Sequence, residues 1–281
     1  MANLIPVRSA KSGSEWTLND LESYHISLSQ VEPLPFFGLQ ELPQPSVDQE
    51  LLTIADAAPM RNDRHAELIT LLDLAMMPQK GDEPPWMILS SNSSGLWAMF
   101  IENEWPARGL TSSSLSVANP GAQRTDVCIV DRSRNDVLLV VQEDRRLENR
   151  EPVNARAQLV AEAVAAFNEN NIQRDAVGLP PFVEKARDFV IVDSVLRACS
   201  SQVIPGIVMV GTSPSFFKIP VTQSLSTHIR HGTYPPEVTC VTYCYPPVPR
   251  PARRLSEGMK PLDNRREILK CYEAFKAIVG I

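Results

Sequence analysis

Residues 125–131 are Thr-Asp-Val-Cys-Ile-Val-Asp, and residues 137–145 are Val-Leu-Leu-Val-Val-Gln-Glu-Asp-Arg after a polar turn. Two short apolar runs bounded by polar clusters predict two strands joined as a hairpin. After a charged, proline-containing break, residues 154–171 combine good helix formers with apolar side chains at helical spacing. They predict an amphipathic helix that stops at Asn170-Asn171, so that the unit is strand, turn, strand, helix.

Acidic residues stand at the ends of both predicted strands. Side chains alternate along a strand, so Val141, Glu143 and Arg145 share one face of the second strand. Gln142 and Asp144 share the opposite face. The register of the hairpin decides which of these two groups meets the aspartate of the first strand.

The partner of Asp126 follows from how the hairpin pairs. If Val130 pairs with Val137 across the turn, Asp126 lies opposite Val141, and directly opposed side chains point the same way. Asp126 then lies diagonally beside Glu143, on the same face. A register one residue away would present the other face of the second strand, and the polar turn is long enough to leave both registers open.

An aspartate followed by a hydrophobic strand that ends in Glu-x-Arg resembles the PD-(D/E)XK, or restriction-endonuclease-like, family. In that family an acidic residue and a Glu-x-Lys pair hold a divalent metal and position a water at a phosphodiester. The resemblance implies that Asp126, Glu143 and Arg145 are the catalytic residues. It also implies a Mg²⁺ ion bound by Asp126 and Glu143, or by Asp144 in the shifted register, because Mg²⁺ prefers oxygen ligands.

The resemblance further implies side chains that support the metal site without touching the ion. The family's next helix packs beside the site and often contributes a Gln or Glu, and here Gln158 and Glu162 share a helix face. Glu67 lies on a predicted helix before the first strand, where nuclease-like folds often carry an outer acidic residue. A solvated helix carboxylate is the alternative for Glu67. Gln142, beside Glu143, completes this supporting set.

One position departs from the family pattern. The expected lysine is Arg145, which stays charged, whereas a buried lysine can lower its pKa and help to activate water. Arg145 can still neutralise charge or clamp a phosphate with its planar fork. Lys218, in a later predicted strand, is a candidate for the missing ammonium group.

A second resemblance covers most of the chain. The sequence is similar to a group of uncharacterised proteins of mushroom-forming fungi, which carries no known activity. The shared segments are Phe36-Phe37-Gly38, Glu41-Leu42-Pro43, Val141 to Arg145, Gln158 to Ala163, Ile204 to Ile207, and the tail from Gly258-Met259 to Phe275-Lys276. The nuclease resemblance, by contrast, rests mainly on residues 126–171.

The composition is that of an ordinary globular protein, with 281 residues, 43% hydrophobic and 21% charged. The net charge of −6 argues against a general affinity for nucleic acid, although a locally basic groove stays compatible with such a partner. No stretch is long and apolar enough for a membrane span, and the first residues lack the apolar core of a signal peptide. We therefore expect an intracellular protein, in cytoplasm or nucleus, without a membrane partner.

Cysteines and histidines give weaker signals. The chain has 5 cysteines, an odd number that predicts reduced thiols. Cys240 and Cys244 have a spacing loosely compatible with zinc, but burial in a strand is the favoured interpretation. His228 and His231 are three apart on a predicted helix, and no third ligand accompanies them.

Local patterns assign most of the remaining chain. Helices are predicted over residues 16–25, 46–56, 63–76, 221–231 and 262–279. Strands are predicted over residues 26–31, 110–117, 189–192, 207–211, 215–221 and 238–245. Pro220 suggests that its strand is an edge strand. A proline-rich arm at 32–45 is pinned by Phe36-Phe37, with partner binding as the alternative, and 246–254 is an extended surface segment.

The order of these elements predicts an α/β or α+β fold with a central mixed β-sheet flanked by helices. The resemblance implies a restriction-endonuclease-like core with an N-terminal extension. Residues 1–60 would form an arm and short helices packed on the core, and residues 61–281 the nuclease-like domain.

Three functions are compatible with the sequence. The first is a Mg²⁺-dependent phosphodiester hydrolase that acts on nucleic acid. The second is a catalytically degenerate member that serves as a binding or regulatory module for a protein partner. The third is an enzyme that reuses the scaffold for a small molecule, in a pocket near the hairpin lined by Trp86, Trp97 or Phe216.

Overall fold

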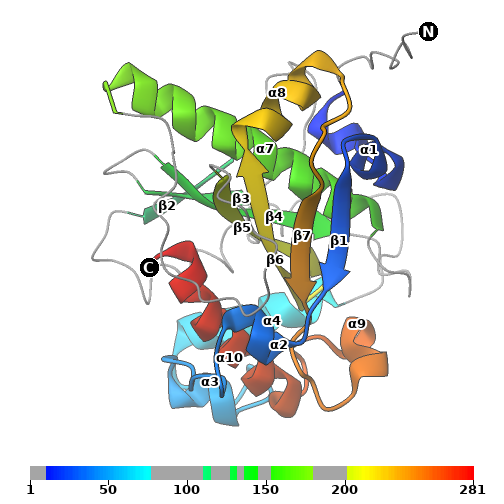
Figure 1. Cartoon of the computed structure of the whole chain (residues 1–281). Helices are drawn as coiled ribbons and strands as arrows, with labels where there is room; N and C mark the ends of the chain where they lie inside the picture. Colours follow the sequence, from blue (N-terminus) through cyan, green and yellow to red (C-terminus); the bar gives the residue numbers. More distant parts are fainter. Residues whose placement is uncertain (1–10, 77–109, 115–126, 132–135, 145–152, 180–200) are drawn as a thin grey trace, which may run out of the picture.

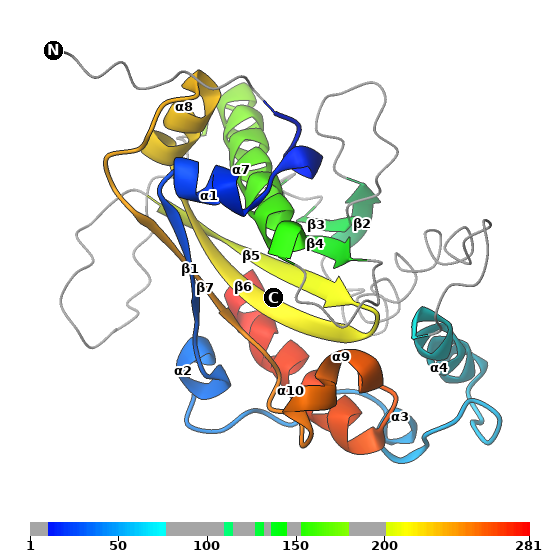
Figure 2. The ribbon, with the colours of Figure 1, turned by 90° about the vertical axis from the view of Figure 1, so that its right-hand side faces the viewer.

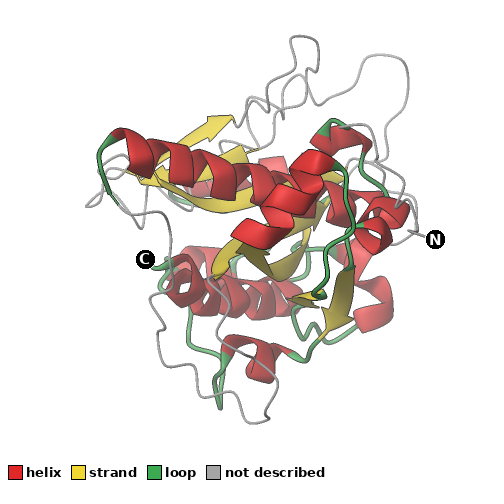
Figure 3. Ribbon diagram, turned by 45° about the horizontal axis from the view of Figure 1, so that its top comes forward, coloured by secondary structure: helices red, strands yellow, loops and turns green. Residues whose placement is uncertain are grey.

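Helices cover both faces of one mixed β-sheet, which confirms the predicted α/β architecture with a central mixed sheet (Figure 1). The computed structural model describes residues 11–76, 110–114, 127–131, 136–144, 153–179 and 201–281. Figure 3 shows the layers, with helices above and below the strands. The strand predicted at 189–192 lies outside the described residues.

Within the described residues the sheet has seven strands, in the order β1-β7-β6-β5-β4-β3-β2. The pairs β1–β7 and β4–β5 are parallel, and the other neighbours are antiparallel. The strands are β1 (Ile26–Gln30), β2 (Leu110–Ser114), β3 (Val127–Asp131), β4 (Asp136–Asp144), β5 (Ser201–Val210), β6 (Ser213–Thr222) and β7 (Thr239–Cys244). The N-terminal segment therefore adds a strand, β1, to the same sheet as the rest of the chain.

The helices form two layers. The first layer contains η1 (Gly13–Glu15), α1 (Leu18–Ser23), α7 (Val153–Ala176) and α8 (Gln223–His231). The second contains α2 (Pro33–Phe37), α3 (Gln49–Thr53), α4 (Asp63–Ala75), η3 (Pro251–Arg253), α9 (Arg254–Glu257) and α10 (Leu262–Val279). The predicted helices at 63–76 and 262–279 are confirmed as α4 and α10.

α7 lies at the centre of the first layer and of the largest hydrophobic core. Leu159, Val160 and Phe167 of α7 are buried together with Ile204 and other residues of the sheet. A side chain of this kind contributes about 1.5–3 kcal/mol when fully buried. At Gly206 of β5 an added Cβ would lie 2.9 Å from Leu159 Cδ2. A larger residue at this position would therefore have to displace the end of the Leu159 side chain.

The second face of the sheet is covered by α2 and α10 and is rich in phenylalanine. Phe36 and Phe37 are buried, which confirms that they pin the arm to the body. Phe37 lies edge-on to Phe216 of β6, with ring centroids 6.0 Å apart, and Phe216 lies 5.0 Å from Phe275 of α10. Such pairs add about 0.5–1.5 kcal/mol beyond burial. The arm is not wholly irregular, since α2 begins with Pro33 at its first position.

The prediction that Pro220 marks an edge strand is wrong. Its strand, β6, lies inside the sheet between β5 and β7. The ladder between β6 and β7, however, extends only from Phe216 to Lys218. Pro220 lies beyond this ladder, so its missing N–H removes no bond to β7.

Asn170 does not end the helix, as the sequence predicted, but joins α7 to β4. The helix continues past it, and its side chain is fully buried. Asn170 Oδ1 accepts from the Val137 N–H at 2.6 Å, and Nδ2 donates to the Val137 carbonyl at 3.1 Å. The ladder between β4 and β5 begins only at Val140 and Gly206. A side-chain amide thus satisfies main-chain groups of Val137 where β5 does not pair.

We expect Asn170→Ala to lower the free energy of unfolding by about 2–3 kcal/mol, because it leaves two buried main-chain groups without partners. Asn154→Ala, at an exposed position of the same helix, is the matched control and should change it by less than about 0.5 kcal/mol. Urea denaturation followed by circular dichroism measures both. Equal effects would show that the amide bridge contributes nothing to stability.

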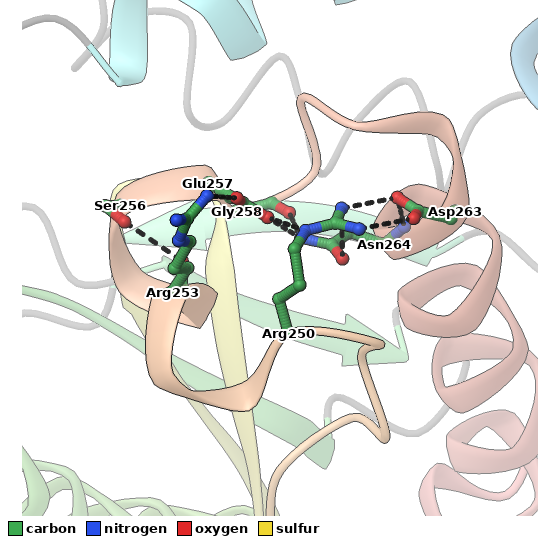
Figure 4. A network of polar contacts seen from close by, with 7 residues as sticks. All are labelled: Arg250, Arg253, Ser256, Glu257, Gly258, Asp263 and Asn264. Atoms are coloured by element: carbon green, nitrogen blue, oxygen red, sulfur yellow. Dashed lines mark hydrogen bonds and ion pairs between the residues drawn. The ribbon is translucent and has the colours of Figure 1, made fainter.

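Residues 246–254 fold onto the body instead of forming an extended surface segment, which corrects the prediction. Val248 is 5% exposed, and residues 251–253 form η3. Arg250 Nε donates to Glu257 Oε2 at 2.6 Å, and its Nη atoms donate to the Asp263 carboxylate at 2.7 and 2.8 Å (Figure 4). One guanidinium therefore joins this loop to α9 and to the first turn of α10.

The Arg250 clamp should weaken in acid. Hydrogen bonding to Arg250 lowers the pKa of Asp263 to about 2. A carboxyl group whose pKa is lowered by folding stabilises the native state above its unfolded pKa of about 3.9, and this contribution is lost as the pH falls toward about 2.

Urea unfolding of the wild type and Asp263→Asn tests this between about pH 6 and about pH 3. The difference in free energy of unfolding between the two proteins should shrink toward the low end of that range. Asp175→Asn, at the exposed end of α7, is the control. A difference that does not change with pH would contradict the expected role of Asp263.

Candidate functional site

The carboxyl ends of β1, β4, β5 and β7 lie at one edge of the sheet, because these strands run in the same direction. α7 begins beside this edge, since it connects the end of β4 to the start of the parallel strand β5. Figure 2 shows α7 on one side of the sheet and α10 on the other. In open α/β sheets ligands bind outside the carboxyl ends of strands, so this edge is the candidate site.

The register of the β3–β4 hairpin changes along its length. Val130 pairs with Val137, as assumed from the sequence, but a bulge follows next to Val130. Val127 consequently pairs with Val141, whereas an unbroken ladder would pair it with Val140. The bulge produces, at the far end of the hairpin, the one-residue shift that the sequence leaves open. In this register the alternation of side chains predicts Asp126 on the same face as Gln142 and Asp144, and not beside Glu143.

Glu143 and Asp144 are the last two residues of β4 and pair with β5 at the candidate edge. The side chains of Gln142, Glu143 and Asp144 lie outside the described part of the structure. Asp126 and Arg145 lie outside it entirely. The convergence of Asp126 and Glu143 on one metal ion therefore stays a prediction.

Three of the predicted supporting residues are described in full. Gln158 Nε2 donates to the Ser14 carbonyl at 2.7 Å, so this side chain ties η1 to α7. Glu162, one turn further along α7, is 3% exposed, and interactions within the fold stabilise a carboxylate buried to this degree. Glu67 is exposed on α4, in the opposite helical layer, where a solvated carboxylate is expected.

Lys218 lies away from the end of β4. It pairs with Pro205 of β5, four residues before Met209, the partner of Glu143, which is about 13 Å along the strand. Its Nζ donates to the Phe36 carbonyl and lies 4.7 Å from the centre of the Phe36 ring. Burial lowers the pKa of Lys218. The described contacts place its ammonium group at α2, on the second face of the sheet.

The cysteine and histidine pairs that the sequence suggested as metal ligands make local contacts instead. Cys240 is exposed and Cys244 buried, and four residues of strand separate them by about 13 Å, too far for one zinc ion. Burial raises the pKa of the Cys244 thiol. His228 Nδ1 contacts Thr233 Oγ1 at 2.7 Å, and His231 Nδ1 contacts the carbonyl of residue 227 at 2.8 Å. Among the described residues, no three side chains of His, Cys, Asp or Glu form a group that could hold a metal.

Phe216 does not line a pocket, which corrects the sequence-based expectation, because it is fully buried among aromatic rings of α10. Trp86 and Trp97 lie outside the described residues. An open hollow of about 720 Å³ lies instead between α3 and α4, lined by Asp48, Glu50, Ile54, Pro59, Arg61 and Asn62. The Glu50 carboxylate in this hollow accepts hydrogen bonds from two backbone N–H groups and contacts His65, so its oxygens already have partners within the fold.

A cluster of two arginines and two tyrosines lies near the carboxyl end of β7, and no sequence pattern predicted it. The Arg156 guanidinium of α7 lies 4.6 Å from the ring centre of Tyr243 and 5.9 Å from that of Tyr245. Arg156 also donates hydrogen bonds to both tyrosine hydroxyls. The Arg254 guanidinium lies 3.7 Å from the Tyr245 ring centre. We call these four residues the Arg–Tyr cluster.

The Arg–Tyr cluster combines two ways of holding an anionic, aromatic ligand. Guanidinium groups pair with phosphate oxygens, and tyrosine rings stack on flat groups such as nucleobases. Arg156 is 9% exposed and fixes the rings, whereas Arg254 is half-buried and reaches solvent. Alternation along a strand predicts that Tyr243 and Tyr245 share a face. Their contact with Arg156 joins positions about ninety residues apart, which no local pattern predicts.

Comparison of the chain with protein-family models, with curated proteins and with solved structures finds no match in any of the three. The candidate site is therefore supported by geometry alone. In the described residues, no helix combines the length and the apolar character needed to cross a bilayer.

We expect Gln158→Ala to loosen the N-terminal segment without affecting the binding of a divalent ion. Loss of its bond to Ser14 should lower stability by about 0.5–1.5 kcal/mol and speed hydrogen exchange at residues 13–15. Hydrogen exchange with mass spectrometry and calorimetric titration with Mg²⁺ measure the two effects. If the variant instead loses ion affinity with unchanged exchange, Gln158 supports the metal as the resemblance implies.

Proposed function

We propose that this chain is a divalent-metal-dependent phosphodiester hydrolase with a restriction-endonuclease-like core, acting on nucleic acid. One observation carries the proposal: the β3–β4 hairpin is followed by α7 and then by β5, which lies parallel to β4. This connection puts the end of β4, with Glu143, at the same edge as the first turns of α7. The PD-(D/E)XK resemblance depends on that unit.

Carboxylates at this edge suit Mg²⁺. The pairing of Val127 with Val141 is the shifted register, in which Asp126 and Asp144 are expected on the same face. Asp126 and Asp144 would then hold the ion, and Glu143 would replace Asp144 only in the register assumed from the sequence, since hard divalent cations prefer carboxylate oxygens. When bound, the metal supplies polarisation of a phosphoryl oxygen and activation of a water. Arg145 would neutralise charge on the phosphate and orient it with a bidentate contact.

The Arg–Tyr cluster supports a nucleic-acid substrate. β7 lies three strands from β4, about 14 Å across the sheet, and Tyr243 is level with Val140, about 10 Å before Glu143 along the strand. An oligonucleotide of several nucleotides can span both places. Arg254 would meet a phosphate and Tyr245 a base. A local cationic surface of this kind is compatible with an anionic substrate despite the net charge of −6.

Asp144→Ala should lower Mg²⁺- or Mn²⁺-dependent cleavage of DNA or RNA by at least about 100-fold, because the ion loses a ligand in the observed register. Glu143→Ala should have this effect only in the register assumed from the sequence. Fluorogenic oligonucleotides incubated with the purified full chain provide the measurement. Glu169→Ala, an exposed glutamate of α7, is the matched control and should retain activity. Full activity in both Asp144→Ala and Glu143→Ala, or a wild-type chain that binds no divalent ion at about millimolar concentration, would overturn the proposal.

The second candidate is a catalytically degenerate member that binds metal and nucleic acid without cleaving. Arg145 in place of lysine favours it, because an arginine cannot give up its proton to help activate water. Ion and oligonucleotide binding without cleavage would select this function. Cleavage gained by Arg145→Lys would then identify the arginine as the cause of the loss.

A further inference from the structure

Ser256 lies in a short cationic segment, and its hydroxyl has no role in the proposed hydrolase. The sequence Arg253-Arg254-Leu255-Ser256-Glu257 spans the end of η3 and all of α9. Ser256 is exposed, and 71% of the Arg253 side chain is exposed. Figure 4 shows Ser256 beside Arg253, at the opposite side of the loop from Asp263.

We propose that Ser256 is a phosphorylation site for a serine kinase that selects arginine two and three positions before its target. An acidic substrate groove achieves this selection by charge complementarity with the upstream guanidinium groups. Arg253 and Arg254 occupy those two positions here, on a surface loop. The cations and the hydroxyl therefore stand together where a second protein can reach them.

The segment can open to enter such a groove. η3 has three residues and α9 has four, which is too short for either helix to be stable alone. The Ser256 hydroxyl donates to the Arg253 carbonyl at 3.1 Å, a bond within the segment itself. Arg253 Nη1 lies 3.6 Å from Glu257 Oε1, an exposed contact that is weak in water. Opening must also break the 2.6 Å bond from Arg250 Nε to Glu257 Oε2 and draw Arg254 away from the Tyr245 ring. These are polar and ring contacts at the surface, so their loss leaves the hydrophobic core intact.

The transfer consumes one ATP. Ser256 Oγ attacks the γ-phosphorus, the new oxygen–phosphorus bond forms, and the bond from the γ-phosphorus to its bridging oxygen breaks. ADP leaves, and the hydroxyl proton passes to the base of the kinase. The product carries a charge of about −1.5 to −2 directly beside Glu257.

This charge would rearrange the cations around it. Arg253 would turn from Glu257 to the phosphate, which is the stronger acceptor. Arg254, now 3.7 Å from the Tyr245 ring centre, is two residues away and would be drawn from the ring by the same charge. Phosphorylation of Ser256 should therefore weaken binding of an anionic ligand at the Arg–Tyr cluster, whether or not the chain cleaves nucleic acid.

Incubation of the folded full chain with ATP and an arginine-directed serine kinase tests the proposal, with sites mapped by mass spectrometry. We expect phosphate on Ser256, its loss in Ser256→Ala, and a rate about tenfold lower in Arg253→Gln, which removes one selected cation. Ser29→Ala, an exposed serine in β1, is the matched control and should behave as wild type.

Two results would overturn the proposal. One is phosphate on other residues of the folded chain with Ser256 unmodified. The other is modification of Ser256 only after denaturation, because the folded segment would then not open. Circular dichroism of each variant separates a kinase effect from a failure to fold.

Discussion

The packing of α7 against the sheet is the contact on which the rest of this structure depends. Leu159 packs so closely on Gly206 that a Cβ there would displace it, and Asn170 satisfies the main chain of Val137 where β5 does not pair. Together these contacts fix the height and direction of the helix. Because α7 runs back along the sheet, β5 enters parallel to β4 and the carboxyl ends of both strands meet at one edge.

That edge concentrates charge of both signs in a protein that is acidic as a whole. β4 ends in Glu143-Asp144, while the first turns of α7 bring Arg156 to the tyrosines of β7. Carboxylates suit a hard cation and guanidinium groups suit phosphate, so in the proposed hydrolase the two sets would bind the metal and the substrate respectively. Arg254 contacts Tyr245 and lies two residues before Ser256. Phosphorylation of Ser256 would therefore change the charge next to the Arg–Tyr cluster.

Strong local periodicity made much of the fold predictable. The apolar stripe of α10, the alternation in β7 and the apolar runs of β3 and β4 each bury one recurrent set of side chains, and the structure follows those patterns. The incorrect predictions concerned residue types that have more than one structural role. Pro220 marked the end of a ladder inside the sheet, and Asn170 looked like a helix stop although it bonds a strand. Residues 246–254 were predicted to be extended because nothing in that segment indicates the carboxylates that hold Arg250, which lie on α9 and α10.

By itself the sequence determined the mixed α/β class, the hairpin followed by a helix, and the presence of acids at the end of β4, because these depend on neighbours in the chain. Only the tertiary structure decided the strand order, the bulge that shifts the hairpin register, and the meeting of Arg156 with Tyr243 and Tyr245. Those features join residues distant in sequence. Which of them meet is set by the packing of whole layers and the satisfaction of buried polar groups, and short-range patterns do not encode either.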